Sequence, residues 1–316
     1  MNIGGLVGAL VPVFFVLALG YFAGKRNSFD ADQAAGLSKL AVSYALPAAL
    51  FVGMTDIPKD LLLQQGRLVI ALILSHAGLF LVTWACFRLT KIVSSTAAII
   101  YALMLSTSAT PVFGLAVLRP LLGPTSSGAV GLIALAINLT VPPAIILLEM
   151  DAASKQKIVS NSTKQNPILT GLTAGLTSPL LWAPILGIAI VLAGYHLPMV
   201  VTSSFQLIGS ITSGVAVFAV GLVLAAHRIS LSRVVLLGTL GRIIVQSVVL
   251  FALLHLLNVV SPFAREALVC CSFPLATVVV LFAARYKSSE AESASMLLFS
   301  TLALAVTVPA MLWLSR

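Results

Sequence analysis

The chain has 316 residues, of which 59% are hydrophobic and only 9% are charged, and its mean hydropathy is +1.11. A soluble globular domain has about a quarter of its residues charged, so this composition excludes a soluble protein. The formal net charge is +9, but the lysines and arginines are scattered singly between apolar runs. This distribution is typical of loops between membrane spans and not of a nucleic-acid-binding patch.

Long apolar runs, joined by short polar loops, predict an all-α polytopic membrane protein with ten transmembrane helices. The first run follows no basic leader, and we interpret it as a span and not as a removable signal peptide. The spans are expected at roughly 4–24, 36–54, 67–87, 96–118, 126–148, 176–195, 200–226, 234–257, 264–284 and 292–315.

The basic residues also predict the direction of the chain. Most lysines and arginines outside the spans lie in the loops after the first, third, fifth, seventh and ninth spans. Positively charged loops stay in the cytoplasm, so both termini are expected outside the cell.

The second half of the sequence repeats features of the first half at a nearly constant offset. For example, the similar segments "NLTVPPAIILL" and "AVTVPAMLWL" end the fifth and tenth spans, and their prolines Pro142 and Pro309 are 167 residues apart. Two repeats of five spans must enter the membrane from opposite sides, because five is odd. Inverted repeats are a recurring design of secondary transporters, with the substrate site near the midplane. The division is expected to be a first repeat at 1–150, a cytoplasmic linker at 151–175 and a second, inverted repeat at 176–316.

Spans 4 and 9 carry proline and small polar residues at their centres, in "MLSTSATPVFGLAV" (104–117) and "CCSFPLATVVV" (270–280). Proline removes a backbone donor and clashes with the preceding turn, so we expect both helices to break at their prolines. Backbone N–H and C=O groups left unpaired by such a break are stable within a membrane only where protein or a water-filled cavity can hydrogen-bond them. We therefore expect helices 4 and 9 to cross at the midplane, and the simpler alternative is a packed proline kink. Two helix N-termini at such a crossing would suit an anion.

The residues expected to bind the substrate are Ser106, Thr107, Ser108, Ala109, Thr110, Pro111, Cys271, Ser272, Phe273, Pro274 and Thr277, together with Asn138 of the fifth span.

Three further polar residues are candidates for a counter-charge or for coupling. Arg242 lies inside the eighth span, with Gln246 one turn further on the same face. We interpret Arg242 either as a counter-charge for a carboxylate or as a structural arginine that reaches carbonyls or headgroups. His76, in the third span, is either a proton carrier or a hydrogen-bonded packing residue. No carboxylate is expected at the midplane, so coupling to H⁺ or Na⁺ and an uncoupled, facilitative carrier are both open.

The cysteines predict no metal site. Cys86, Cys270 and Cys271 have the spacing neither of a zinc site nor of a disulfide framework, so no metal and no cofactor is expected. The chain also has no HExxH motif, no G-x-S-x-G motif and no paired intramembrane acids, so an enzyme is not expected.

Two long segments resemble a known family. "GYFAGKRNSFDADQAAGLSKLAVSYALPAALF" (20–51) is similar to the start of the auxin efflux carrier family, and "FPLATVVVLFAARYKSSEAESASMLLFSTLALAVTVP" (273–309) to its ninth and tenth spans. The nearest likeness is to the bacterial malonate carriers. The family often has asparagine at the span-4 crossing, where this chain has Ala109, so the neighbouring hydroxyls are candidates to replace that amide.

The resemblance implies a ten-helix fold shared with the plant PIN carriers, crossing helices 4 and 9, a scaffold with a mobile transport domain, and a homodimer in the plasma (inner) membrane. It also implies an organic anion as substrate, such as malonate, another carboxylate or auxin. We therefore expect a secondary or facilitative transporter that works by alternating access. A channel-like protein and an anion-binding sensor that transports nothing are the alternatives.

Overall fold

A computed structural model of the protein describes residues 3–123, 126–156, 179–227, 229–259 and 262–315. Within these ranges the fold is all-helical, as the sequence predicts, and a single antiparallel bridge is the extent of its β-structure. The helices are α1 (Ile3–Lys25), α2 (Ala31–Leu40), η1 (Ala41–Ala45), α3 (Leu46–Thr55), α4 (Lys59–Leu63), α5 (Gly66–Ile73), η2 (Leu74–Gly78), α6 (Leu79–Thr90), α7 (Ser95–Ser106), α8 (Thr110–Leu122), α9 (Ser126–Gln156), α11 (Pro179–Leu192), α12 (Met199–Gly209), α13 (Thr212–Ala226), α14 (Arg233–Leu256), α15 (Pro262–Cys270), α16 (Thr277–Arg285) and α17 (Glu290–Leu314).

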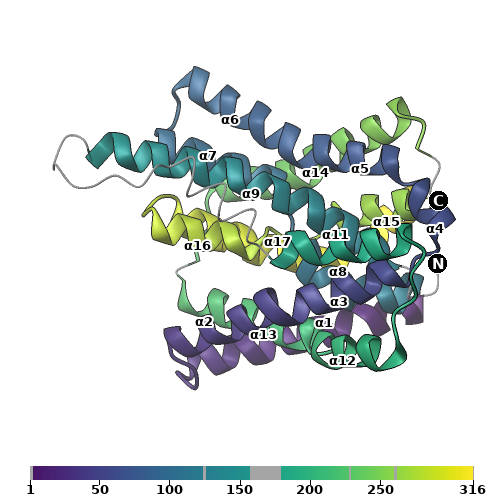
Figure 1. The fold of residues 1–316 in the computed structure, drawn as a ribbon. Coiled ribbons are helices and arrows are strands. Elements are labelled where there is room, and N and C mark those ends of the chain that lie inside the picture. Colours follow the sequence, from purple (N-terminus) through teal and green to yellow (C-terminus); the bar gives the residue numbers. More distant parts are fainter. Residues whose placement is uncertain (1–2, 124–125, 157–178, 228, 260–261, 316) are drawn as a thin grey trace.

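The helices form a bundle in which α1 begins and α17 ends at the same end, on the right in Figure 1. Among the described residues, seven helical stretches are long and apolar enough to cross a membrane. They are Val7–Lys25, Asp32–Thr55, Gly66–Thr90, Ser126–Ala152, Met199–Ala226, Arg233–Leu256 and Glu290–Leu314. A span of about 20 residues matches a hydrocarbon core of about 30 Å. The chain is therefore a multi-pass membrane protein.

Polar caps start several helices at the ends of the bundle. Asp30 accepts a hydrogen bond from the backbone N–H of Gln33 at 2.7 Å, and the Gln33 side chain accepts one from the Asp30 N–H at 3.0 Å. Ser94 caps α7 and Ser232 caps α14 with one bond each, because their hydroxyl oxygens accept from the backbone N–H three residues on. Such caps satisfy N–H groups that the helix itself leaves unpaired, and they explain where these helices begin.

Two spans contain a π-helical turn. The turn η1 joins α2 to α3 just before Pro47, and η2 joins α5 to α6 around His76. A π-helical turn inserts an extra residue into a helix and is frequent at functional sites. In η2 it coincides with the histidine that the sequence marks as a candidate.

Glycines let two pairs of helices approach closely. A Cβ atom on Gly221 of α13 would overlap the backbone carbonyl of Leu17 on α1, and one on Gly20 would overlap the carbonyl of Phe218. In the other pair, a Cβ atom on Gly187 of α11 would lie 2.9 Å from the carbonyl oxygen of Phe51 on α3. The α1–α13 pair lies along one side of the bundle in Figure 1.

Proline does not by itself interrupt a helix in this fold. Six prolines lie inside helices that continue past them, namely Pro12, Pro120, Pro142, Pro143, Pro184 and Pro309. The predicted linker at 151–175 begins within α9, which continues to Gln156, and the rest of that linker lies outside the described residues.

The close approach of α1 and α13 makes a stability prediction. Gly221→Ala should destabilise the protein by about 1–3 kcal/mol, the usual range for overpacking, because the added methyl group must push the two helices apart. Gly214→Ala is the matched control on the same helix, since a Cβ atom there meets nothing within 4 Å. Thermal unfolding in detergent should show a lower midpoint for Gly221→Ala alone. Equal midpoints for the two variants would contradict the close approach.

Candidate functional site at two interrupted helices

The first interruption separates α7 from α8. Thr107 is extended, with φ −113° and ψ 146°, and the chain resumes a helix at Thr110. Pro111 lies in the first turn of α8, where its missing N–H leaves no helical bond unmade. The break therefore precedes the proline, and Pro111 starts the second helix instead of kinking a continuous one.

The second interruption separates α15 from α16. The non-helical connection runs from Cys271 to Ala276, and Pro274 lies within it. The hydroxyl group of Ser272 donates to the Val269 carbonyl at 2.6 Å and so satisfies an acceptor in the last turn of α15. Both N-caps after the breaks, Ala109 and Ala276, are without a side-chain cap.

The two connections lie against each other and share hydrogen bonds. The Ala109 N–H donates to the Pro274 carbonyl at 2.7 Å, and Ser108 forms the antiparallel bridge with Leu275. The Thr110 hydroxyl reaches the Cys270 carbonyl at 3.4 Å. Each break thus supplies partners for backbone groups that lipid could not satisfy.

Helix α17 supports the same place from the side. The Ser300 hydroxyl oxygen accepts from the Leu275 N–H at 3.1 Å, and the Thr307 hydroxyl donates to the Ser272 carbonyl at 3.3 Å. Sequence reasoning missed both residues. Their signal is two hydroxyl groups in an apolar span, but such hydroxyls commonly bond within their own helix, so the signal is weak.

Arg242 of α14 ties the two connections together. Its side chain is 0% exposed; Nε donates to the Thr107 carbonyl at 3.1 Å and Nη1 to the Phe273 carbonyl at 2.6 Å. The guanidinium thus lies at the C-terminal ends of α7 and α15, where the helix dipoles favour a positive charge. In the described part of the chain, Nη2 has no hydrogen-bond partner and no carboxylate pairs with Arg242.

Gln246 and His76 extend this polar cluster. Gln246 Nε2 lies 3.0 Å from His76 Nε2 and 3.4 Å from the Ser106 carbonyl oxygen. His76 Nδ1 lies 2.9 Å from the Leu72 carbonyl, which can only accept, so Nδ1 carries the proton and Nε2 is the acceptor. Gln246 Oε1 is buried with no partner among the residues described. The cluster therefore contains two buried polar atoms, on side chains one turn apart, that the protein leaves unsatisfied.

The structure brings most of the predicted site residues together. Residues 106–110 and 271–273 are at most 2% exposed, Pro111 and Pro274 are buried, and Thr277 is half-buried at the start of α16. Asn138 is not part of these contacts. Its side-chain amide donates to the Ala134 carbonyl at 2.7 Å, within its own helix α9. Its place in the substrate site stays a prediction without a contact to support it.

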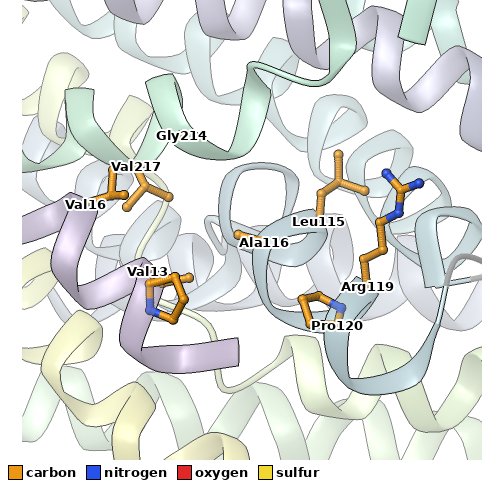
Figure 2. Close-up of a pocket in the computed structure, with 9 residues that line it drawn as sticks. Val13, Val16, Leu115, Ala116, Arg119, Pro120, Gly214 and Val217 are labelled. Carbon is orange, nitrogen blue, oxygen red and sulfur yellow. The ribbon is translucent and has the colours of Figure 1, made fainter. Parts of the chain in front are cut away.

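Two cavities are lined in part by α8, the helix that follows the first interruption. One, of about 450 Å³, has mostly apolar walls from α1, α8 and α13 (Figure 2). The other, of about 310 Å³, is lined by Asp56 and Gln206 among others and shares Leu115 and Arg119 with the first. Burial raises the pKa of the Asp56 carboxyl, which lies just after α3, and the Arg119 charge lowers it in part. The residues of the two interruptions are buried and line neither cavity, so neither cavity reaches the interruptions in this conformation.

Interrupted helices that meet in a buried polar cluster are typical of membrane transport proteins. A family model described as membrane transport protein matches residues 6–312. The chain is 31% identical over 314 residues to YfdV of Escherichia coli K12, described as an uncharacterized transporter, with 98% of each chain covered. The YfdV proteins of E. coli O157:H7 and Shigella flexneri match with the same identity and coverage. The chain therefore belongs to the auxin efflux carrier family of membrane transport proteins, which agrees with the prediction that it is not an enzyme.

The bond from Ser300 to the second connection can be tested by stability. Ser300→Ala leaves the buried Leu275 N–H without its partner, and an unsatisfied buried donor costs about 1–3 kcal/mol. Ser293→Ala is the matched control, because Ser293 is equally buried on α17 but its hydroxyl bonds the Glu290 carbonyl of its own helix. Thermal unfolding should show the larger loss for Ser300→Ala. The reverse order would mean that α17 does not hold the connection.

Proposed function

We propose that this protein is a secondary or facilitative transporter of a small organic anion, such as malonate, another carboxylate or an auxin-like indole acid. It works by alternating access around the α7/α8 and α15/α16 interruptions. The observation that carries the proposal is the buried guanidinium of Arg242, whose Nη2 has no partner in the described ranges. Membership of a membrane transport family supports transport as the activity.

The chemistry of the cluster favours an anion as the ligand. A buried charge is stable only when it is paired and hydrogen-bonded, and Arg242 has backbone carbonyls but no acid beside it in the part of the chain that is described. Nη2 and the second hydrogen of Nη1 form a planar fork that fits the two oxygens of a carboxylate. The uncapped N-termini of α8 and α16 add N–H groups at the positive ends of two helix dipoles.

The proposal includes ten spans in two inverted repeats. The seven long stretches, α11 and the two interrupted pairs, each counted as one span, correspond to the ten spans expected from the sequence. Two repeats of five spans make span 1 equivalent to span 6 and span 2 equivalent to span 7. If span 1 packs against span 7, span 6 should therefore pack against span 2. In support, α1 of span 1 packs against α13 of span 7, and α11 of span 6 packs against α3 of span 2. We also infer that both termini face outward in the plasma membrane and that the protein is a homodimer.

Alternating access requires one part of the bundle to move past another. The glycine-mediated α1–α13 and α11–α3 pairs would form the scaffold, and α14 with the two interrupted pairs would form the mobile domain of an elevator mechanism. The cavity of about 450 Å³ between α8 and the α1–α13 pair lies along the boundary of these two parts (Figure 2). A closed crossing favours such a carrier over an open channel.

Purified protein in liposomes tests the proposal. Uptake of radiolabelled malonate, indole-3-acetate and other small carboxylates should exceed that of empty liposomes and saturate with concentration. Applying membrane potential, H⁺ and Na⁺ gradients separately distinguishes facilitative from coupled transport. Uptake that stays linear would favour a channel, and binding of a carboxylate without any uptake would favour a sensor.

Arg242 makes the sharpest prediction for transport. Arg242→Met should lower carboxylate uptake at least tenfold, because charge-assisted hydrogen bonds contribute about 1.5–3 kcal/mol. Arg233→Met is the matched control, since Arg233 lies on the same helix but is exposed at its first turn. Size-exclusion profiles check that both variants fold. Unchanged uptake by a well-folded Arg242→Met variant would remove the proposed anion site.

A further inference from the structure

His76 presents a buried basic nitrogen to the candidate anion site. Its ring is 2% exposed in η2, and the bond from Nδ1 to the Leu72 carbonyl holds one orientation of the ring. The Ser75 hydroxyl lies 3.3 Å from the same nitrogen. Nε2, which carries the lone pair, therefore faces Gln246 on the neighbouring helix α14. A histidine in this tautomer can take up one proton without losing its bond to Leu72.

Gln246 can accommodate His76 in both protonation states. Its amide now donates from Nε2 to the histidine acceptor, and its Oε1 has no partner in the described structure. Turning the amide by half a rotation brings Oε1 to the ring, where it accepts a hydrogen bond from a protonated Nε2. A carboxylate in this position would favour only the protonated ring, and a lysine only the neutral one, whereas an amide suits either.

Charged groups around His76 are few. Helices α5, α6, α7, α9 and α14 pack against η2. Arg67 of α5 and Arg88 of α6 lie at the ends of those helices that are distant from η2 in sequence, as do Arg233 and His255 at the two ends of α14.

Helix α7 has no charged residue, and its Tyr101 ring packs on Phe87 with the ring centroids 5.9 Å apart. The acids of α9, Glu149 and Asp151, lie near its C-terminal end and pair with Arg285 and Thr96. The charged and titratable groups nearest Gln246 are Arg242, one turn away on α14, and the Cys271 thiol, whose Sγ lies 3.9 Å from the Gln246 carbonyl oxygen.

An anion at Arg242 and a proton on His76 would affect each other's binding. A proton on His76 and the charge of Arg242 repel each other in a poorly screened interior, whereas an anion bound at Arg242 attracts that proton. Anion binding and proton binding therefore assist each other, and such linkage is reciprocal by thermodynamic necessity.

We propose that His76 takes up a proton when an organic anion binds at Arg242, with the Gln246 amide turning between the two states, so that proton and anion cross the membrane together. This inference rests on the proposed transport of an organic anion and names its coupling ion. The proton comes from the side that delivers the anion and leaves with it on the other side.

Proton movement in liposomes tests the coupling. With malonate as the probe and pyranine trapped inside, malonate uptake by the unmodified protein should acidify the interior. A gradient of one pH unit, acidic outside, should support up to about tenfold accumulation per coupled proton. His76→Gln should abolish acidification and the effect of the gradient, and any malonate uptake that remains should not respond to the pH difference. His196→Gln is the matched control, because that histidine is exposed between α11 and α12.

A second measurement does not depend on transport. Nuclear magnetic resonance of ¹⁵N-histidine-labelled protein, with the His76→Gln variant identifying the signal, reports the protonation of His76 directly. The neutral ring should carry its proton on Nδ1, and adding malonate at constant pH should raise the protonated fraction. Arg242→Met should remove this response to malonate.

Several outcomes would overturn the coupling and leave anion transport standing. They are uptake without acidification, a His76 signal that malonate does not change, or acidification lost in Glu266→Gln but kept in His76→Gln. Glu266 provides this contrast because it is a buried carboxyl group whose Oε2 has no hydrogen-bond partner among the residues described. If no carboxylate is transported, the proposed function fails, and the resonance experiment still decides whether His76 responds to an anion.

Discussion

The need to satisfy backbone polar groups inside a membrane governs this structure. Each interrupted helix leaves N–H and C=O groups that hydrocarbon cannot solvate. The protein resolves this by placing the two interruptions against each other, so that the Ala109 N–H meets the Pro274 carbonyl and Ser300 of α17 meets the Leu275 N–H. The polar cluster is thus a consequence of backbone pairing, and the side chains that a ligand would meet are arranged around it.

Arg242 connects this backbone arrangement to the proposed anion site. Its bonds to Thr107 and Phe273 keep the two connections together, and they also explain why a full charge is tolerated at a fully buried position. The remaining nitrogen, Nη2, together with Oε1 of Gln246, is left over after the structural bonds are made. A residue that was open to a structural or a ligand-binding interpretation therefore has groups available for both roles, because a guanidinium has more donors than the two carbonyls can use.

Sequence reasoning found the two stretches that contact each other but not how they are joined. The stretches 104–117 and 270–280 stand out because small polar residues and proline are unusual within apolar spans. Proline was a poor guide to the breaks themselves, since helices such as α9 and α17 continue past theirs and Pro111 starts a helix. Ser300 and Thr307 were missed, because a helical hydroxyl that bonds a neighbouring segment has the same sequence signature as one that bonds its own turn.

The sequence by itself determined that the chain is helical and membrane-spanning, to which family it belongs, and which spans carry polar centres, because hydropathy and local residue type act over a few residues. Only the tertiary structure decided which residues of these spans touch. Gln246 and His76 are 170 positions apart, and Arg242 lies 135 positions from Thr107. Contacts over such separations depend on how whole helices pack, and packing follows from the summed shapes of many side chains, which no short stretch of sequence contains.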